Sequence, residues 1–212
     1  AGEPPAGARG ESGGRKAKKD KAPKEKPDQP AKGPAEPAEA APRSELSRLD
    51  IRVGRVTAAK KHPDADNLYI ETIDLGEDKP RTVVSGLAKF VPLTDLEGTD
   101  VVVVCNLKPM TMQGVESAGM VLCASVEDGD AKAVEVVRPP AGCTPGERIA
   151  FAGHEGDPEG NPNAVKKKKL WEAVAPRLKT DGDGVATYDG TVPFQTSQGP
   201  CRVQQLKGAP IK

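Results

Sequence analysis

The stretch that decides the fold is residues 105–125, CNLKPMTMQGVESAGMVLCAS, which follows directly on a run of four valines. An apolar strand leads into a short polar excursion punctuated by Gly and Pro, and the chain then returns to a second apolar strand. The excursion carries Asn106, Lys108, Gln113 and Ser117, which can form hydrogen bonds but include no nucleophile with a base beside it. This pattern is typical of a binding surface on a small barrel rather than of a catalytic centre.

The residues before the excursion predict the rest of that barrel. Leu49, Ile51 and Val53 alternate with polar residues, but Val56 falls on the opposite parity, and we attribute the slip to a bulge beside Gly54 that bends the first strand. Four more strands are predicted at residues 68–75, 81–85, 99–105 and 119–125, with a turn at 62–66 and at most a short helix within 87–96. Five short strands with a bent first one predict a mainly β protein with a five-stranded OB-fold barrel, although a β-sandwich also satisfies the spacing.

A smaller β-rich region follows the barrel and contains one amphipathic helix. Leu170, Trp171, Val174 and Leu178 fall on one helical face, and Asn163 is the expected cap. Short strands are expected at residues 134–137, 148–151, 185–188, 192–195 and 201–206.

The first 44 residues have a different composition from the rest of the chain. They contain 8 Pro, 6 Gly and 10 Ala but no Val, Ile, Leu, Met, Phe, Tyr, Trp or Cys. A segment that cannot bury apolar surface cannot offset the entropy of ordering it, so we expect a disordered tail. Its lysine-dense part, residues 15–26, is either a solvated linker or an auxiliary RNA contact.

The formal net charge of zero hides a weak asymmetry between these two parts. The tail has 10 Lys and Arg against 7 Asp and Glu, and the remainder has 21 against 24. The chain therefore has no overall basic field, and any binding of a polyanion must come from a local patch.

The cysteines and the hydropathy indicate a cytoplasmic protein. Cys105, Cys123, Cys143 and Cys201 form no CxxC pair, which argues against structural zinc, and the first two lie inside apolar strand patterns as reduced core residues. No stretch approaches the roughly 20 apolar residues of a membrane span, and the polar start is not a signal peptide.

Four segments together carry a resemblance to a known family. They are SRLDIRVGRV, KHPDADNLY, PRTVVSGL and CNLKPxxMxGxxSxxMxLCAS, and the similarity extends over about residues 46–212 through PPAGCTPGERI, KKKKLWE and VATYDG. The chain resembles the tRNA-binding module of the endothelial monocyte-activating polypeptide family, which recurs in the multisynthetase-complex scaffold protein and at the C-termini of some tyrosyl- and plant methionyl-tRNA synthetases.

The resemblance implies a domain organisation and a partner. Residues 1–44 would be the tail, 45–149 the OB-fold domain, and 150–212 an appendage that packs on the barrel as a dimer partner does in shorter relatives, giving a monomer. Transfer RNA would be bound by shape and backbone, in support of an aminoacyl-tRNA synthetase in cis or in trans. Gln113 stands where family members often carry a cation, so phosphate contact there should be weaker.

Twelve residues are candidates for contact with RNA. Lys108 offers a contact to phosphate, whereas Asn106 and Ser117 offer hydrogen bonds to the sugar–phosphate backbone or, alternatively, tie the excursion together. Side chains at strand ends that would form a groove, unless they are scattered surface residues, are Lys60, Lys61, Arg81, Ser85 and Lys89. The last four are Lys166, Lys167, Lys168 and Lys169, which open the predicted helix where its dipole disfavours cations, so that a polyanion explains them better than stability does.

The sequence also limits the other classes of function. It has no P-loop, GxSxG or HExxH motif, and His62 with Asp64 and Asp66 reads as a turn rather than a metal site. We therefore expect neither catalysis nor a cofactor. Two alternatives remain: a cytokine-like signalling polypeptide acting through RVGRVTA at 52–58, and a scaffold tethered by the tail.

Overall fold

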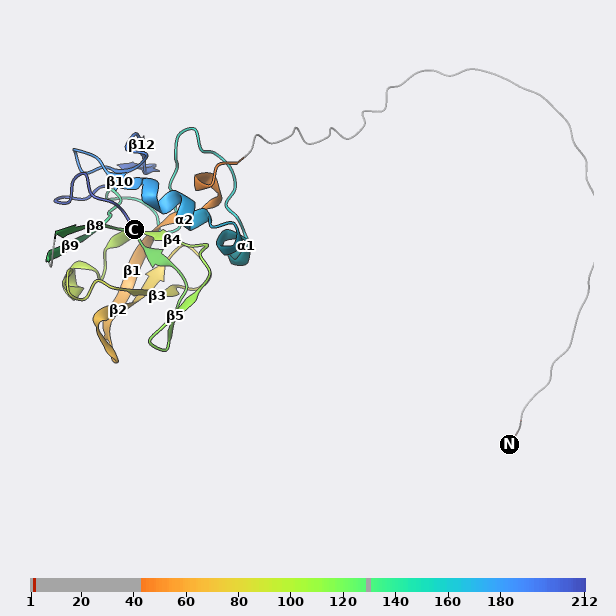
Figure 1. The fold of residues 1–212 in the computed structure, drawn as a ribbon. Helices are drawn as coiled ribbons and strands as arrows, with labels where there is room; N and C mark the ends of the chain where they lie inside the picture. Colours follow the sequence, from red (N-terminus) through yellow and green to blue (C-terminus); the bar gives the residue numbers. More distant parts are fainter. Residues whose placement is uncertain (1, 3–42, 129–130) are drawn as a thin grey trace, which may run out of the picture. The chain divides into compact units, whose positions relative to one another are not determined.

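A computed structural model describes residue 2 and residues 43–128 and 131–212, and the predicted tail at 1–44 lies almost wholly outside this part. A five-stranded antiparallel sheet in the order β3-β2-β1-β4-β7 curls into a barrel (Figure 1). Its strands are β1 (Ile51–His62), β2 (Ala65–Asp74), β3 (Arg81–Ser85), β4 (Asp100–Val104) and β7 (Met120–Val121). The amide of Ala118 donates to the carbonyl of Thr82 at 2.9 Å, which brings the two edges together and makes the barrel nearly closed. The predicted OB-type barrel is confirmed.

The run of four valines is buried on both faces of β4. Val101 and Val103 belong to the barrel interior, while Val102 and Val104 belong to a second core shared with the C-terminal region. All four are 0% exposed. A strand covered on both sides loses the alternation of a half-buried strand, which explains the continuous apolar run.

The predicted bulge beside Gly54 is wrong in its position. β1 pairs with β4 in unbroken register from Ile51 to Arg55, and the register shift in its pairing with β2 lies between Val56 and Ala58. The change of parity has another cause: Ile51 belongs to the shared core, whereas Val56 belongs to the barrel interior. β1 therefore buries first one face and then the other.

Gly54 has a packing role instead. A Cβ built there would lie 2.6 Å from Cγ2 of Ile73 and 2.9 Å from Cδ2 of Leu75. Glycine allows β1 and β2 to cross closely as the sheet curls.

The excursion between the last two barrel strands contains a hairpin that the sequence pattern did not predict. β5 (Met110–Met112) pairs with β6 (Val115–Ser117), and the turn between them has positive φ at Gln113 (47°) and Gly114 (83°). Positive φ at both central residues is the conformation of a tight two-residue hairpin. Gln113 is thus at the tip of a projecting arm.

β8 (Cys123–Asp128) and β9 (Ala131–Val136) follow the five-stranded sheet, and Cys123 and Val136 still belong to the barrel interior. The C-terminal region after them is β-rich and packs on the outer face of β1 and β4. Its elements are α1 (Pro162–Lys167), α2 (Leu170–Val174), β10 (Leu178–Thr180), β11 (Ala186–Tyr188), β12 (Val192–Pro193), β13 (Gln195–Thr196) and β14 (Gly199–Pro200). Three short 3-10 turns complete the described elements: η1 (Leu46–Arg48), η2 (Leu93–Asp95) and η3 (Ala175–Arg177). The predicted segments 148–151 and 201–206 form isolated bridges rather than strands, for example between Ala150 and Gln195.

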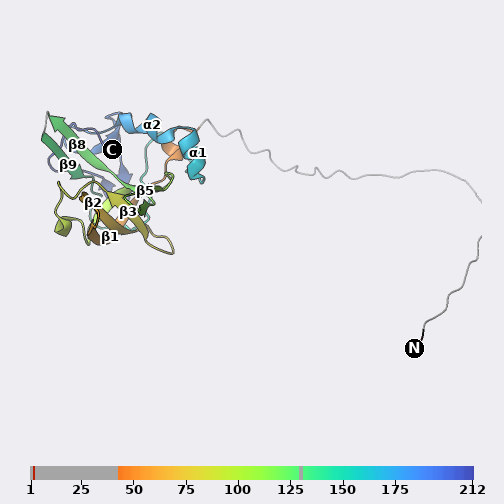
Figure 2. The same cartoon turned by 60° about the horizontal axis from the view of Figure 1, so that its bottom comes forward.

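The single predicted helix is interrupted. α1 is capped by Asn161, not Asn163, because Oδ1 of Asn161 accepts the Asn163 amide at 2.9 Å. Lys169 then takes a left-handed conformation with φ 51° and ψ 40°, and α2 begins after it (Figure 2). Leu178 is buried as predicted, but from β10.

Candidate nucleic-acid interface

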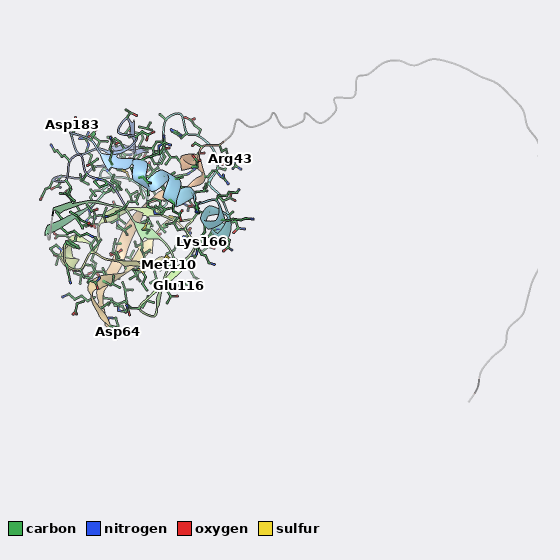
Figure 3. The ribbon with its side chains drawn as sticks, viewed as in Figure 1. Arg43, Asp64, Met110, Glu116, Lys166 and Asp183 are labelled. Carbon is green, nitrogen blue, oxygen red and sulfur yellow. The ribbon has the colours of Figure 1, made fainter. Side chains whose placement is uncertain are left out.

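One groove gathers several of the predicted residues beside the β5–β6 hairpin. It has a volume of about 390 Å³ and is lined by residues 84–87 and Phe90, by Leu107 and Lys108, by parts of β5 to β9, and by Lys212. Met110, Met112 and Met120, which are all three methionines of the chain, line it, so we call it the methionine groove. Figure 3 labels Met110 of β5 and, close to it, Glu116 of the paired strand β6.

Ser85, Lys108 and Ser117 line the methionine groove, but their roles differ. The Ser117 hydroxyl accepts a hydrogen bond from the Val84 amide at 2.9 Å and donates to the Gly119 carbonyl at 3.0 Å. It is buried and holds the hairpin to β3. Lys108 is exposed, and none of the described side chains pairs with its amine.

Asn106 is a structural residue within the described part of the chain. Its Oδ1 accepts the Asp50 amide at 2.9 Å, and its Nδ2 donates to the carbonyls of Arg48 and Glu159 at 2.9 and 3.0 Å. These bonds use most of the hydrogen-bonding capacity of the Asn106 amide. They also join the start of the excursion to the segment that leads into α1. For Asn106 and Ser117, the alternative in which they tie the excursion together agrees with these contacts.

Arg81 is half-buried, and its guanidinium is bonded to other groups of the protein. Its guanidinium makes a two-pronged pair with Glu77 at 2.6 and 2.7 Å and donates to the carbonyls of Cys105 and Ala118. Its pKa is raised, mainly by the hydrogen bond to Glu77, and the pKa of Glu77 is correspondingly lowered. A phosphate would have to displace this carboxylate, which makes Arg81 a poor contact for RNA.

Ser85 bonds to a buried acid behind the groove. Its hydroxyl donates to Oε1 of Glu71 at 2.5 Å, and Oε2 of Glu71 has no partner among the described residues. Burial raises the pKa of Glu71 to about 7, so near neutral pH this carboxyl exchanges readily between its charged and neutral forms.

The remaining lysines fall into separate places. Lys60 and Lys61 are exposed near the end of β1, beside the turn that carries Asp64, and in Figure 3 Asp64 and Lys166 lie at different edges of the molecule. Lys89 is exposed next to Phe90, which lines the methionine groove. Lys60 and Lys61 therefore do not share one compact patch with α1.

The lysine cluster ends a helix rather than opening one. Lys166 and Lys167 form the last turn of α1, Lys168 caps it, and Lys169 is the left-handed link to α2. A helix C-terminus favours cations, so the argument from dipole repulsion is wrong for this cluster. All four are exposed, and Lys168 lies 3.4 Å from Glu159, which also pairs with Arg48 at 2.8 Å.

α1 and the hairpin belong to the same side of the described fold. Asn106, at the start of the excursion, bonds to Glu159 in the segment before α1, and in Figures 1 and 2 α1 and β5 lie on the same side. Acidic residues are present between them, but Glu159 is neutralised by Arg48 and Lys168, which leaves Glu116 as the exposed carboxylate of the hairpin.

Sequence reasoning missed Phe90, Lys132 and Lys212 as residues of the groove. Lys132 lies 5.9 Å from the centre of the Phe90 ring and pairs with Glu127 at 3.1 Å, and Lys212 lies 3.5 Å from the same carboxylate. These residues come from three distant segments, so no spacing in the sequence signals their meeting.

The described residues hold no set of acidic, Cys and His side chains that would bind a metal ion. The four cysteines are buried and unbridged, and for Cys105 and Cys123 this agrees with the prediction of reduced core residues. Burial raises the pKa of Cys105, Cys123 and Cys201 to about 12. Thiols with such a pKa stay protonated and are poor nucleophiles.

None of the helices in residues 43–128 and 131–212 has the length and apolar character needed to cross a bilayer.

A nearly closed OB-type barrel with cations at a hairpin-lined groove defines a class, the OB-fold binding modules. Residues 51–148 match the family model described as "Putative tRNA binding domain". The chain belongs to this family of tRNA-binding domains, in the branch that resembles endothelial monocyte-activating polypeptide, and the resemblance seen in the sequence is confirmed.

Three comparisons illustrate the relationship. The chain is 50% identical over 167 residues to the "Probable methionine--tRNA ligase" of Oryza sativa subsp. japonica, covering 79% of this chain and 20% of the relative. It is 48% identical over 169 residues to "Aminoacyl tRNA synthase complex-interacting multifunctional protein 1" of Mus musculus, covering 79% and 52%. The crystal structure of the C-terminal domain of Plasmodium vivax p43 superposes with a TM-score of 0.70 at 34% identity, covering 79% of this chain and 98% of that domain. The chain spans about half or less of the two curated relatives and corresponds to a domain of each.

The segment 52–58, which suggested a signalling role, lies within β1. Val53 and Val56 in it are 0% exposed. A receptor therefore could not contact these two valines unless the first barrel strand unfolded.

Proposed function

We propose that this chain captures folded tRNA by its sugar–phosphate backbone and brings it to an aminoacyl-tRNA synthetase, in cis or in trans. The contact surface is the side that carries Lys108 and the exposed lysines at the end of α1. The observation that carries the proposal is that Asn106 fastens the excursion to the segment before α1, so that both sets of cations belong to one rigid frame. The family of tRNA-binding domains supplies the class of ligand.

A near-neutral protein suits this mode of binding. Most phosphate contacts act without regard to sequence, and their strength depends on local cations rather than on net charge. The modest affinity of such a patch becomes useful when the module is tethered to an enzyme, because tethering raises the effective concentration of tRNA. We accordingly expect no catalysis by this chain alone, and a cytoplasmic location fits its four reduced cysteines.

The salt dependence of binding tests the proposal. The triple variant Lys166→Ala, Lys167→Ala and Lys169→Ala should bind bulk tRNA more weakly, and the slope of log K against log salt should flatten by up to about 2.7. The matched control replaces Lys79, Lys179 and Lys207, which are exposed lysines elsewhere on the described surface. Equal slopes for the two variants would remove the α1 lysines from the interface.

The domain organisation is part of the same proposal. We place the tail at 1–44, the barrel at 45–149 and the appendage at 150–212, with the appendage covering in one chain the face that a dimer partner would otherwise cover. A pull-down of synthetases by the full chain and by residues 45–212 separates tethering through the tail from binding of RNA by the folded part.

A further inference from the structure

The methionine groove has features that backbone contact does not require. Backbone binding needs exposed cations, but this groove is mainly apolar and its volume of about 390 Å³ falls in the range of roughly 300–1,000 Å³ typical of small-ligand sites. Met110 is 67% exposed, one of two large apolar side chains that the described surface leaves open. An unbranched, polarizable side chain adapts to flat ligands of different outline.

The groove also contains an aromatic ring. Phe90 is half-buried and lines the wall next to Lys132. In the methionine groove a flat ligand could stack on the Phe90 ring and make van der Waals contact with the polarizable methionine sulfurs.

A buried polar atom points to a ligand with hydrogen-bonding edges. Ser125 lines the groove and is 3% exposed, yet its Oγ has no partner among the described residues. Such an atom costs free energy in the free protein and regains it when a ligand supplies a donor or an acceptor. Glu71 accepts the Ser85 hydroxyl with Oε1, while its Oε2 is a further buried oxygen without a partner among the described residues.

Lysines form the rim of the methionine groove. Lys108, Lys132 and Lys212 line it, and Glu127 is the carboxylate that pairs with the last two. The groove therefore combines a mainly apolar lining, a buried hydrogen-bonding group and a cationic rim.

From this combination we infer that the methionine groove takes up one unpaired nucleotide of the bound RNA. The base lies between Phe90 and the methionines, with an edge toward Ser125, and its phosphate lies near Lys108. This inference rests on the proposed function, because backbone contacts elsewhere deliver the RNA. It adds a preference for RNA that has an unstacked base beside a duplex.

The test compares two RNAs on the intact chain. One is a short blunt-ended hairpin, and the other is the same hairpin with a single unpaired 2-aminopurine nucleotide at its 3′ end. The second should bind about tenfold tighter, the order expected of one stacked base, and its fluorescence should be quenched on binding. Equal affinities without quenching would overturn the inference and leave the proposed function standing, whereas failure of both RNAs to bind would remove both.

Two variants locate the effect. Met110→Ser should abolish most of the preference for the unpaired nucleotide, whereas the matched control Val126→Ser, which alters the other exposed large apolar residue, should keep it. Ser125→Ala should lower the preference several-fold without lowering the midpoint of thermal unfolding, because its hydroxyl has no described partner to lose. A preference unchanged in Met110→Ser contradicts the proposed site.

A competition experiment tests whether the methionine groove instead binds a protein partner. Excess AMP should restore the fluorescence of the bound 2-aminopurine, and an acidic peptide of Glu and Leu should not. Displacement by the peptide but not by AMP would assign the groove to a protein partner and overturn the inference.

Discussion

Some polar side chains of the excursion at 105–125 bond within the protein instead of facing solvent. Asn106 and Ser117 are the polar residues that a reader of the excursion would choose for ligand contact, yet each bonds to backbone groups of other segments. A polar group inside a barrel wall must find partners, and backbone amides that lose their ladder neighbours are the nearest ones. Lys108 makes no such bond to any described residue and is exposed to solvent.

Glu71 is the residue whose titration should affect folding. Burial raises its pKa from 4.5 to about 7, and the Ser85 hydroxyl and the Arg138 guanidinium offset only part of this. The folded protein therefore keeps a proton that the unfolded chain loses between about pH 4.5 and pH 7, so the free energy of unfolding decreases as the pH rises through this window.

Glu71→Gln should remove this pH dependence. The amide resembles the neutral carboxyl, so we expect the variant to match the parent near pH 4.5 and to be more stable at pH 8 by up to about 3 kcal/mol. Urea unfolding at the two pH values measures the difference. A constant offset between variant and parent at both values would contradict the assignment.

At the level of elements, the interrupted helix is the feature with the clearest physical cost. Lys169 has φ 51°, a conformation that is strained for a residue with a Cβ. It allows α1 to present its lysines while Leu170 and Val174 of α2 turn into the shared core.

Lys169→Gly should therefore separate folding from binding. Relief of the left-handed strain should stabilise the fold by roughly 1 kcal/mol, while loss of the cation should weaken binding of tRNA. The control Lys166→Gly should weaken binding in the same direction but destabilise the fold, because glycine inside a helix costs about 1 kcal/mol. Thermal unfolding and filter binding of both variants give the two readouts, and equal shifts in stability would show that the link is not strained.

On the scale of the whole molecule, the described barrel depends on the region that follows it. One core joins Ile51, Val53 and Val102 of the barrel to Leu170 and Ile211 of the C-terminal part. The amides of Cys123 and Lys212 exchange hydrogen bonds with each other's carbonyls at 3.0 and 2.9 Å, which ties the end of the chain to β8. The barrel strands thus bury two faces, and only one of them faces the barrel interior.

A fragment of residues 43–149 should consequently fail to fold as a stable monomer. Without the appendage the outer face of β4, including Val102 and Val104, is exposed, and an apolar face of this kind unfolds or associates. Chemical denaturation and size-exclusion chromatography of the fragment beside residues 43–212 test this expectation. A monomeric fragment with cooperative unfolding would show that the two regions are independent.

The pattern of the sequence was sufficient for the barrel class, the approximate strands and the position of the polar excursion, because alternation and turn residues are local properties. It failed where a residue's neighbours come from elsewhere. From the sequence, the parity change at Val56 indicates a bulge, whereas the structure explains it by a second core. The four lysines are likewise predicted to open a helix, but the cap at Asn161 and the left-handed Lys169 show that they end one.

What the amino-acid order alone determined about this protein is the set of segments able to form strands, the family to which they belong and the absence of a motif for catalysis. The tertiary structure decided which polar side chains are free to meet a ligand and which are used to hold the barrel together. It also brought Phe90, three methionines, Ser125 and three lysines around one groove. The physical reason is that hydrogen-bond partners and apolar neighbours are chosen across the closed sheet, between residues far apart in the chain, and such choices leave no periodic trace in the sequence.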